Sequence, residues 1–149
     1  MRMKRGIDGK TNGDPHLVPL PMQAVEILRK LHPLTGHGLL VFHGERSHDQ
    51  PISDKTLRAA LLTLGYGLDV QTVYGLRVTA RTLLAKELSI DPLVIEAQLA
   101  HAVKDANGRA YNRTQYLKHR TAMMRVWADY LDKLDKLATG TDVIHFKAA

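Results

Sequence analysis

The strongest constraint on the fold is an apolar stripe near the C-terminal end of the chain, spaced as in an α-helix. Its members recur at intervals of four and three residues, which places them on one helical face and requires a surface to cover that face. The stripe consists of Met123, Trp127, Tyr130, Leu134 and Leu137. This pattern predicts a long last helix in a mainly helical chain.

Four earlier stretches also carry helix signals. Pro21 stands where a helix begins, Ser53 is a candidate N-cap, and Asp91 is a candidate N-cap followed by proline in the first helical turn. Each of the four stretches repeats apolar residues at helical spacing or begins with such a signal. The expected helices cover residues 22–32, 54–65, 78–88 and 90–100.

A small antiparallel sheet is predicted near the N-terminus, which makes the expected fold class α+β with helices dominant. Asn12 and Gly13 have the chemistry of a hairpin turn, and residues 16–20 alternate as a short strand does. A second short apolar run lies between glycines at 36–44 and predicts a strand or an extended loop. The sheet is expected to join the 1–20 and 39–42 regions.

The composition narrows the class of partner. A chain of 149 residues fits one domain. Its 21 lysines and arginines against 15 acids give a charge of +6, which favours nucleic acid as a partner. There is no cysteine, which excludes disulfides and thiolate metal sites, and no apolar run long enough to span a membrane. These features predict a cytoplasmic protein.

Two tyrosines among many cations form the most unusual local feature. Tyr111 and Tyr116 are five residues apart, so on one helix they would point about 140° apart. Tyr111 follows the backbone-breaking pair Asn107-Gly108 and stands where a helix would begin, from which a side chain can reach a cleft. Tyr116 leads into the apolar stripe. We therefore expect chemistry from Tyr111 and packing from Tyr116, although both rings could simply pack.

Further candidate residues lie in three other stretches: Arg77 before the helix expected at 78–88, His101 at the end of another helix, and Lys4 at a strand end. Each signal is weak by itself. Together, RMK (2–4) with HLVPL (16–20), YGLRVTARTLL (74–84), VIEAQLAH (94–101) and AYNRTQYLKHRTAMMRVWADYL (110–131) resemble the catalytic domain of tyrosine recombinases. The likeness is to integrases of the satellite phage P4 type and runs from about residue 2 to about residue 137.

The resemblance implies a helical DNA breaking-rejoining domain and a role for each candidate. Tyr111 matches the nucleophile that attacks a DNA phosphate and forms a 3′-phosphotyrosine. Arg77 matches the residue that grips two phosphate oxygens, and His101 matches a further donor to the same oxygens. Lys4 matches the general acid that protonates the departing 5′-oxygen. The family requires neither a metal nor an energy cofactor.

The sequence departs from the family pattern in three ways. The segment after Lys4 is long, so Lys10 competes for the role of general acid. Tyr74 stands where the family usually has histidine, three residues before Arg77, and a phenol is a weaker base than imidazole. No stretch resembles the family's T-G-x-R-x-x-E, which carries its first arginine. We therefore expect residues 1–139 to be a catalytic domain truncated at its N-terminal side, with 140–149 as a tail.

Three functions are compatible with these residues. The first is a catalytic fragment that is weak or inactive without the first arginine, acting on double-stranded DNA attachment sites and assembling as a tetramer on DNA. The second is an inactive remnant that binds DNA or a partner integrase. The third, an unrelated basic helical domain, leaves the ordered series of motifs unexplained.

Overall fold

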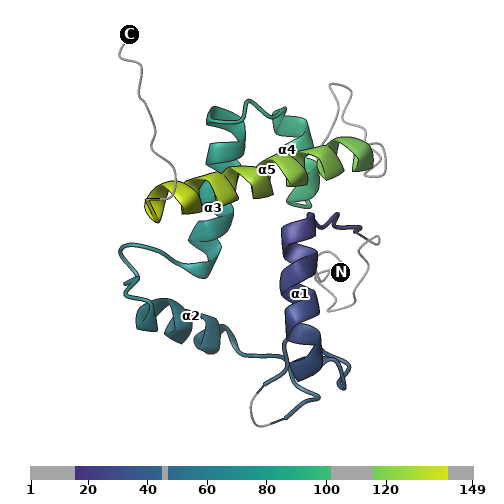
Figure 1. The fold of residues 1–149 in the computed structure, drawn as a ribbon, viewed down its shortest axis with the longest axis vertical. Helices are drawn as coiled ribbons and strands as arrows, with labels where there is room; N and C mark the ends of the chain where they lie inside the picture. The colour runs from purple at the N-terminus through teal and green to yellow at the C-terminus, as the bar shows by residue number, and fades with distance from the viewer. Residues whose placement is uncertain (1–15, 45–46, 102–115, 141–149) are drawn as a thin grey trace, which may run out of the picture. The chain divides into compact units, whose positions relative to one another are not determined.

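The computed structural model of the chain describes residues 16–44, 47–101 and 116–140. They belong to two compact units, one formed by residues 22–87 and the other by residues 1–21 together with 88–149. Figure 1 shows the helices in chain order, with α1, α2 and α3 in the first unit and α4 and α5 in the second.

The unit of residues 22–87 contains three helices, of which α2 and α3 are in contact. Ser53 caps α2 as predicted, because its hydroxyl accepts a hydrogen bond from the Thr56 amide at 3.2 Å. Gly65 follows α2 at a φ of 87°, a conformation that favours glycine. The helices are α1 (Met22–Thr35), α2 (Asp54–Thr63) and α3 (Val73–Lys86).

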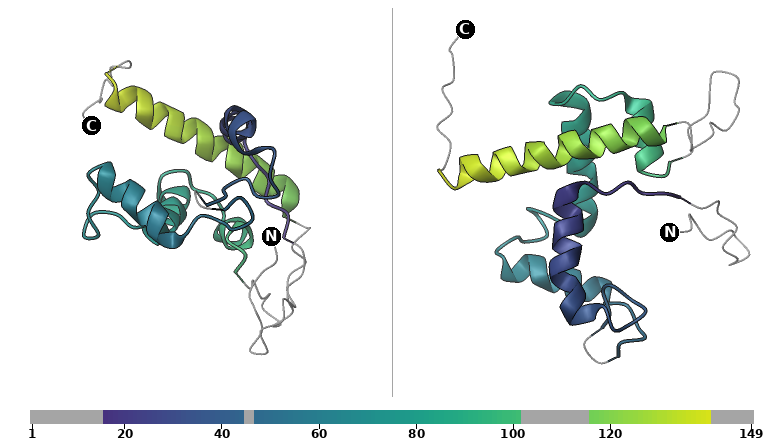
Figure 2. Two further views of the ribbon diagram at one scale, coloured as in Figure 1. Left: turned by 90° about the horizontal axis from the view of Figure 1, so that it is seen from below. Right: turned by 45° about the vertical axis from the view of Figure 1, so that its right-hand side comes forward.

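The second unit is built on the long helix α5 (Leu117–Ala138), which confirms the prediction from the apolar stripe. The short helix α4 (Pro92–Gln98) packs against it, and Figures 1 and 2 show α4 beside the N-terminal half of α5. Asp91 caps α4 as predicted, accepting from the Leu93 amide at 2.8 Å. The most deeply buried apolar side chains of this contact are Ile95 and Met123, at 1% and 2% exposed.

A buried cation lies in the same core. Arg120 is 1% exposed, and its Nε donates to the side-chain oxygen of Gln98 at 2.8 Å. Its Nη2 donates to the Leu17 carbonyl and lies 3.3 Å from Nε2 of His16, which is also buried. These hydrogen bonds join three segments of the unit: residues 16–17, the end of α4 and the first turn of α5.

The small antiparallel sheet was predicted wrongly as far as the described residues show, because 16–44 contain no strand. The 36–44 run is reduced to one isolated antiparallel bridge between His43 and Pro51. Residues 16–20 are extended without a strand partner; the Leu17 carbonyl is bound by Arg120 instead. The hairpin turn expected at Asn12 and Gly13 lies outside the described residues.

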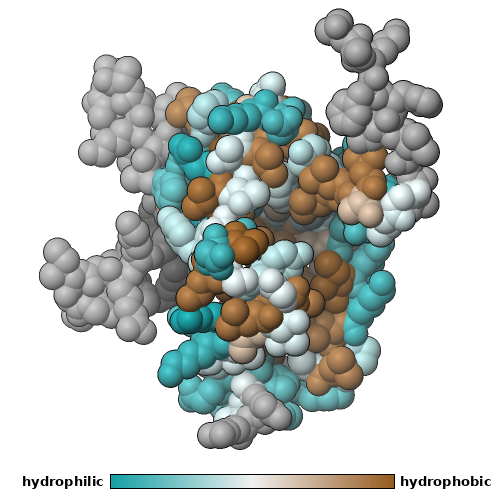
Figure 3. Space-filling view, turned by 90° about the vertical axis from the view of Figure 1, so that its left-hand side faces the viewer, coloured by the Kyte–Doolittle hydropathy of each residue, from teal (hydrophilic) through white to brown (hydrophobic). Residues whose placement is uncertain are grey.

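The surface of residues 22–87 is unusually apolar. Among the described residues of this unit, Leu84 is the one large hydrophobic side chain that is buried. Leu34, Leu39 and Leu64 are 76%, 95% and 70% exposed. Figure 3 shows hydrophobic side chains open to solvent between polar ones on the face that it views. Extended apolar surface of this kind is typical of interaction sites. None of the described helices has the length and hydrophobicity needed to cross a membrane.

The Asp91 cap leads to a test of the α4 boundary. Asp91→Ala removes the acceptor for the Leu93 amide and should lower the free energy of unfolding by about 1 kcal/mol. Asp91→Asn keeps a side-chain oxygen at the cap and should stay close to wild type. Urea denaturation followed by circular dichroism measures both. Equal losses in the two variants would show that the cap hydrogen bond is not what stabilises the start of α4.

Candidate active site

The candidate site residues are divided between the two units. Tyr74 and Arg77 belong to α3 in residues 22–87, whereas His101 follows α4 in the second unit. Lys4, Lys10 and Tyr111 lie outside the described residues. The predicted convergence of these residues on one phosphate therefore stays a prediction, and each group is described in its own unit.

Arg77 lies inside α3, which corrects the expectation that it precedes a helix. The helix begins at Val73 rather than 78, because Thr72 caps it by accepting from the Gly75 amide at 2.9 Å. Tyr74 and Arg77 are three residues apart on this helix and thus share a face. Both side chains are exposed, Tyr74 to 71%. A rigid helix, rather than a loop, carries both candidate phosphate contacts.

A glycine fits the first turn of α3 for a steric reason. A Cβ added at Gly75 would lie 2.8 Å from the side-chain nitrogen Nε2 of Gln71 and 3.0 Å from the hydroxyl oxygen of Thr72. A side chain there would therefore disturb the hydroxyl that caps the helix. Glycine in the YGLR stretch therefore leaves room for the cap at the start of the helix that carries Arg77.

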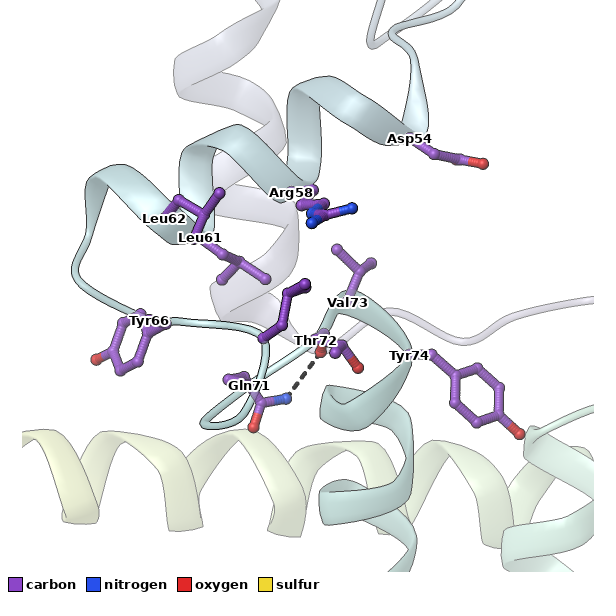
Figure 4. A pocket seen from close by; sticks show the side chains of 10 residues that line it. Asp54, Arg58, Leu61, Leu62, Tyr66, Gln71, Thr72, Val73 and Tyr74 are labelled. Carbon is purple, nitrogen blue, oxygen red and sulfur yellow. Dashed lines mark hydrogen bonds between the residues drawn. The ribbon is translucent and has the colours of Figure 1, made fainter.

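A pocket of about 230 Å³ lies between α2 and the beginning of α3. Figure 4 shows Leu61 and Leu62 facing it from α2, the Gln71 side chain hydrogen-bonded to the Thr72 carbonyl, and Tyr74 extending away from the leucines. The lining is mainly apolar, so this pocket is poorly suited to hold a phosphate. Its lining residues are Asp54, Arg58, Leu61, Leu62, Tyr66, Leu68, Gln71, Thr72, Val73 and Tyr74.

His101 is placed by a specific helix ending. Ala100 adopts a φ of 61°, and its amide donates to the Ala97 carbonyl at 3.3 Å. The His101 amide donates back to the Glu96 carbonyl at 3.0 Å. This pair of bonds is the Schellman ending of α4, in which one left-handed residue reverses the chain. The prediction that a helix ends at His101 is confirmed to within a few residues.

The reversal brings the His101 ring against a carboxylate of the same helix. Nδ1 of His101 contacts Oε2 of Glu96, with the histidine side chain 48% exposed and the glutamate 22%. A carboxylate only accepts hydrogen bonds, so Nδ1 carries the proton of this contact. Nε2 then accepts a proton from an acid when the ring is neutral and donates one to an oxyanion when the ring is charged.

Glu96 is a site residue that the sequence analysis missed. It is five residues before His101, a spacing that does not share a face on a continuous helix. The contact exists because Ala100 turns the chain back, and alanine is an uncommon residue in that conformation. Among the described residues no group of three or more histidine, aspartate or glutamate side chains is arranged to hold a metal ion.

Several known proteins similar to this chain are named integrases. The prophage integrases IntA and IntZ of Escherichia coli K12 are 42% and 40% identical over 126 residues, which is 85% of this chain and 30% of each relative. The integrase of Enterobacteria phage P4 is 34% identical over 80% of this chain and 28% of its own length. Neither a family model nor a solved structure matches.

These similarities extend over most of the chain and agree with its series of motifs. The sequence belongs to the family of phage and prophage integrases. The chain spans less than a third of the length of the relatives it matches.

The left-handed residue before His101 provides a test of the local geometry. Ala100→Gly should raise the free energy of unfolding, by up to about 1 kcal/mol, because glycine adopts a positive φ without steric cost. Ala122→Gly, at an exposed position inside α5, should lower it by about 1 kcal/mol. Chemical denaturation of the two variants compares the same substitution in two backbone conformations. Destabilisation of equal size at both positions would contradict the positive φ at Ala100.

Proposed function

We propose that this chain is the catalytic part of a tyrosine recombinase that cuts and rejoins DNA through a 3′-phosphotyrosine. The observation that carries the proposal is the similarity to integrases over 85% of the chain, a stretch long enough to include the middle of the sequence, where Arg77 and His101 lie. The +6 charge and a cytoplasmic site of action fit double-stranded DNA as the substrate.

The proposed reaction exchanges one phosphoester for another. The Tyr111 phenol gives its proton to a base, for which His101 is the candidate, and its oxygen attacks a DNA phosphorus. The bond from phosphorus to the 5′-oxygen breaks, and Lys4 or Lys10 gives that oxygen a proton. A second DNA 5′-hydroxyl later reverses the step and releases the tyrosine. The phosphotyrosine retains the energy of the phosphodiester, so rejoining needs no nucleotide cofactor.

The described side chains suit the remaining roles. Arg77 has the forked donor set that binds two phosphate oxygens and stabilises the added negative charge of the pentavalent transition state. The Glu96 contact uses Nδ1 of His101, so Nε2 is the ring nitrogen that would serve a phosphate oxygen or the attacking phenol. Tyr74 can donate a hydrogen bond from its exposed hydroxyl.

A second candidate function is an inactive remnant that binds DNA or a partner integrase. It is favoured by the sequence itself, which contains no stretch of the form T-G-x-R-x-x-E. Under either proposal this chain by itself cleaves DNA weakly or not at all. Attachment sites as targets and a tetramer on DNA belong to the first proposal.

Substitution of each tyrosine tests which of the two is the nucleophile and which only packs. In a full-length integrase that carries this chain, Tyr111→Phe should abolish the covalent adduct with a nicked suicide DNA, because no phenol remains at that position. Tyr116→Phe should leave the adduct, since this ring stands at the N-terminal end of α5 edge-on to His119. Arg77→Ala should slow adduct formation with the nucleophile intact. Denaturing gels measure adduct formation by all three variants. An adduct from Tyr111→Phe but none from Tyr116→Phe would show that Tyr116, and not Tyr111, is the nucleophile.

DNA binding by this chain should depend steeply on salt. Each phosphate neutralised by a cation contributes about −0.9 to the slope of log K against log salt concentration, because condensed counterions are released. Arg77→Ala should reduce the magnitude of that slope by about 0.9, the contribution of one phosphate contact. Fluorescence anisotropy with a labelled duplex provides the measurement. Tight binding that is insensitive to salt would indicate a partner other than the DNA backbone.

A further inference from the structure

The guanidinium of Arg120 is the most deeply buried charged group among the described residues, at 1% exposed. Burial lowers the pKa of this group from its usual range, but an arginine remains protonated in proteins. A buried cation is costly unless its donors are satisfied. An apolar residue could fill the same space, as Met123 does one turn later on α5. The presence of Arg120 in the core therefore needs an explanation other than packing.

One hydrogen bond of Arg120 goes directly to the last residue of α4. Nε donates to the side-chain oxygen of Gln98 at 2.8 Å. Nε2 of His16 lies 3.3 Å from Nη2 and 3.2 Å from the Gln98 backbone carbonyl, and it can accept from the guanidinium or donate to the carbonyl but not both at once. The direct hold of Arg120 on Gln98 is therefore the hydrogen bond to its side chain.

Gln98 is followed directly by the turn that places His101. Leu99 ends α4, Ala100 takes the left-handed conformation, and the His101 amide bonds back to Glu96. A rotation of this last turn would change the direction of the His101 ring together with the Glu96 carboxylate, because the turn carries both. Apolar contacts at Ile95 and Met123 hold α4 against α5 but have no preferred direction, whereas the hydrogen bond to Gln98 fixes its rotation.

We propose that Arg120 is a positioning residue that holds the end of α4 through Gln98 and thereby sets the orientation of the His101 imidazole. The consequence for catalysis rests on the function proposed above, while the effect on His101 geometry does not. Arg120 itself touches no substrate in this proposal. A misplacement of about 1 Å at a reacting group can reduce a rate by up to 100-fold.

The test compares Arg120→Met and Arg120→Lys with the control Met123→Ala. The control removes a buried side chain of the same helix and should cost about 2 to 5 kcal/mol of stability without touching Gln98. Lysine keeps the charge but has one nitrogen in place of the three of the guanidinium, so it cannot bind Gln98 and Leu17 in the same geometry. In this chain, NMR follows the His101 imidazole signals, assigned by their loss in His101→Gln, and the amide exchange of Ala100 and His101. In the full-length integrase, the adduct rate is measured at saturating DNA, together with the Kd for DNA.

Both Arg120 variants should shift the His101 imidazole signals and speed the two amide exchange rates by about tenfold or more, the change expected from losing a hydrogen bond to a charged group. The adduct rate should fall by about 10- to 100-fold at unchanged Kd. Met123→Ala, below its melting temperature, should change neither the imidazole signals nor the adduct rate. If Arg120→Met does not fold, Arg120→Lys and Gln98→Ala give the same comparison.

Two results would overturn the inference. One is that the Arg120 variants and Met123→Ala behave alike in the NMR measurements, which would make Arg120 a core residue only. The other is an adduct rate that stays at the wild-type value while the imidazole signals shift, which would separate the geometry from catalysis. If the wild-type integrase forms no adduct, the proposed function fails, and the NMR comparison alone decides whether Arg120 positions His101.

Discussion

The second unit depends on one buried positive charge. Arg120 is enclosed where the first turn of α5 meets the end of α4 and the extended residues 16–17. An amide oxygen, a main-chain carbonyl and an imidazole nitrogen replace the water that a guanidinium would otherwise bind. Losing one of them would leave a donor of a buried cation unsatisfied, which costs more than the hydrogen bond itself contributes. Three segments distant in sequence are therefore constrained together by one side chain.

The same helix end carries the candidate chemistry. α4 has only 7 residues, so its last turn is a large part of the helix, and both Arg120 and His101 lie at its C-terminal end. Glu96 contributes its carbonyl to the Schellman ending and its carboxylate to the His101 ring. A single turn thus defines the direction of the chain after the helix and also places Nδ1 of the His101 ring against Glu96. Structural and chemical constraints coincide at Gln98 to His101.

Local signals in the sequence predicted the helices, and long-range contacts explain the errors. Ser53 and Asp91 act through their own next few residues, so their caps could be predicted. The predicted start of α3 was five residues too late, because Thr72 caps the helix at Val73 and Arg77 therefore lies inside it. Alternation at residues 16–20 suggested a strand, but the Leu17 carbonyl is bound by a residue 103 positions away. Neither that contact nor the Glu96 pair at His101 has a periodic signature.

Tyr74 also affects which side chain would accept a proton in the proposed reaction. By the resemblance, histidine usually stands at this position, whereas the exposed phenol on α3 can donate a hydrogen bond to a phosphate but is a weaker base than imidazole. A proton acceptor for the attacking tyrosine must then come from elsewhere. His101 is the candidate, because its contact with Glu96 uses Nδ1 and Nε2 is the other ring nitrogen. Under the proposed function, tyrosine in place of histidine on α3 means that His101, held by Glu96, would be the base that accepts the proton of the attacking tyrosine.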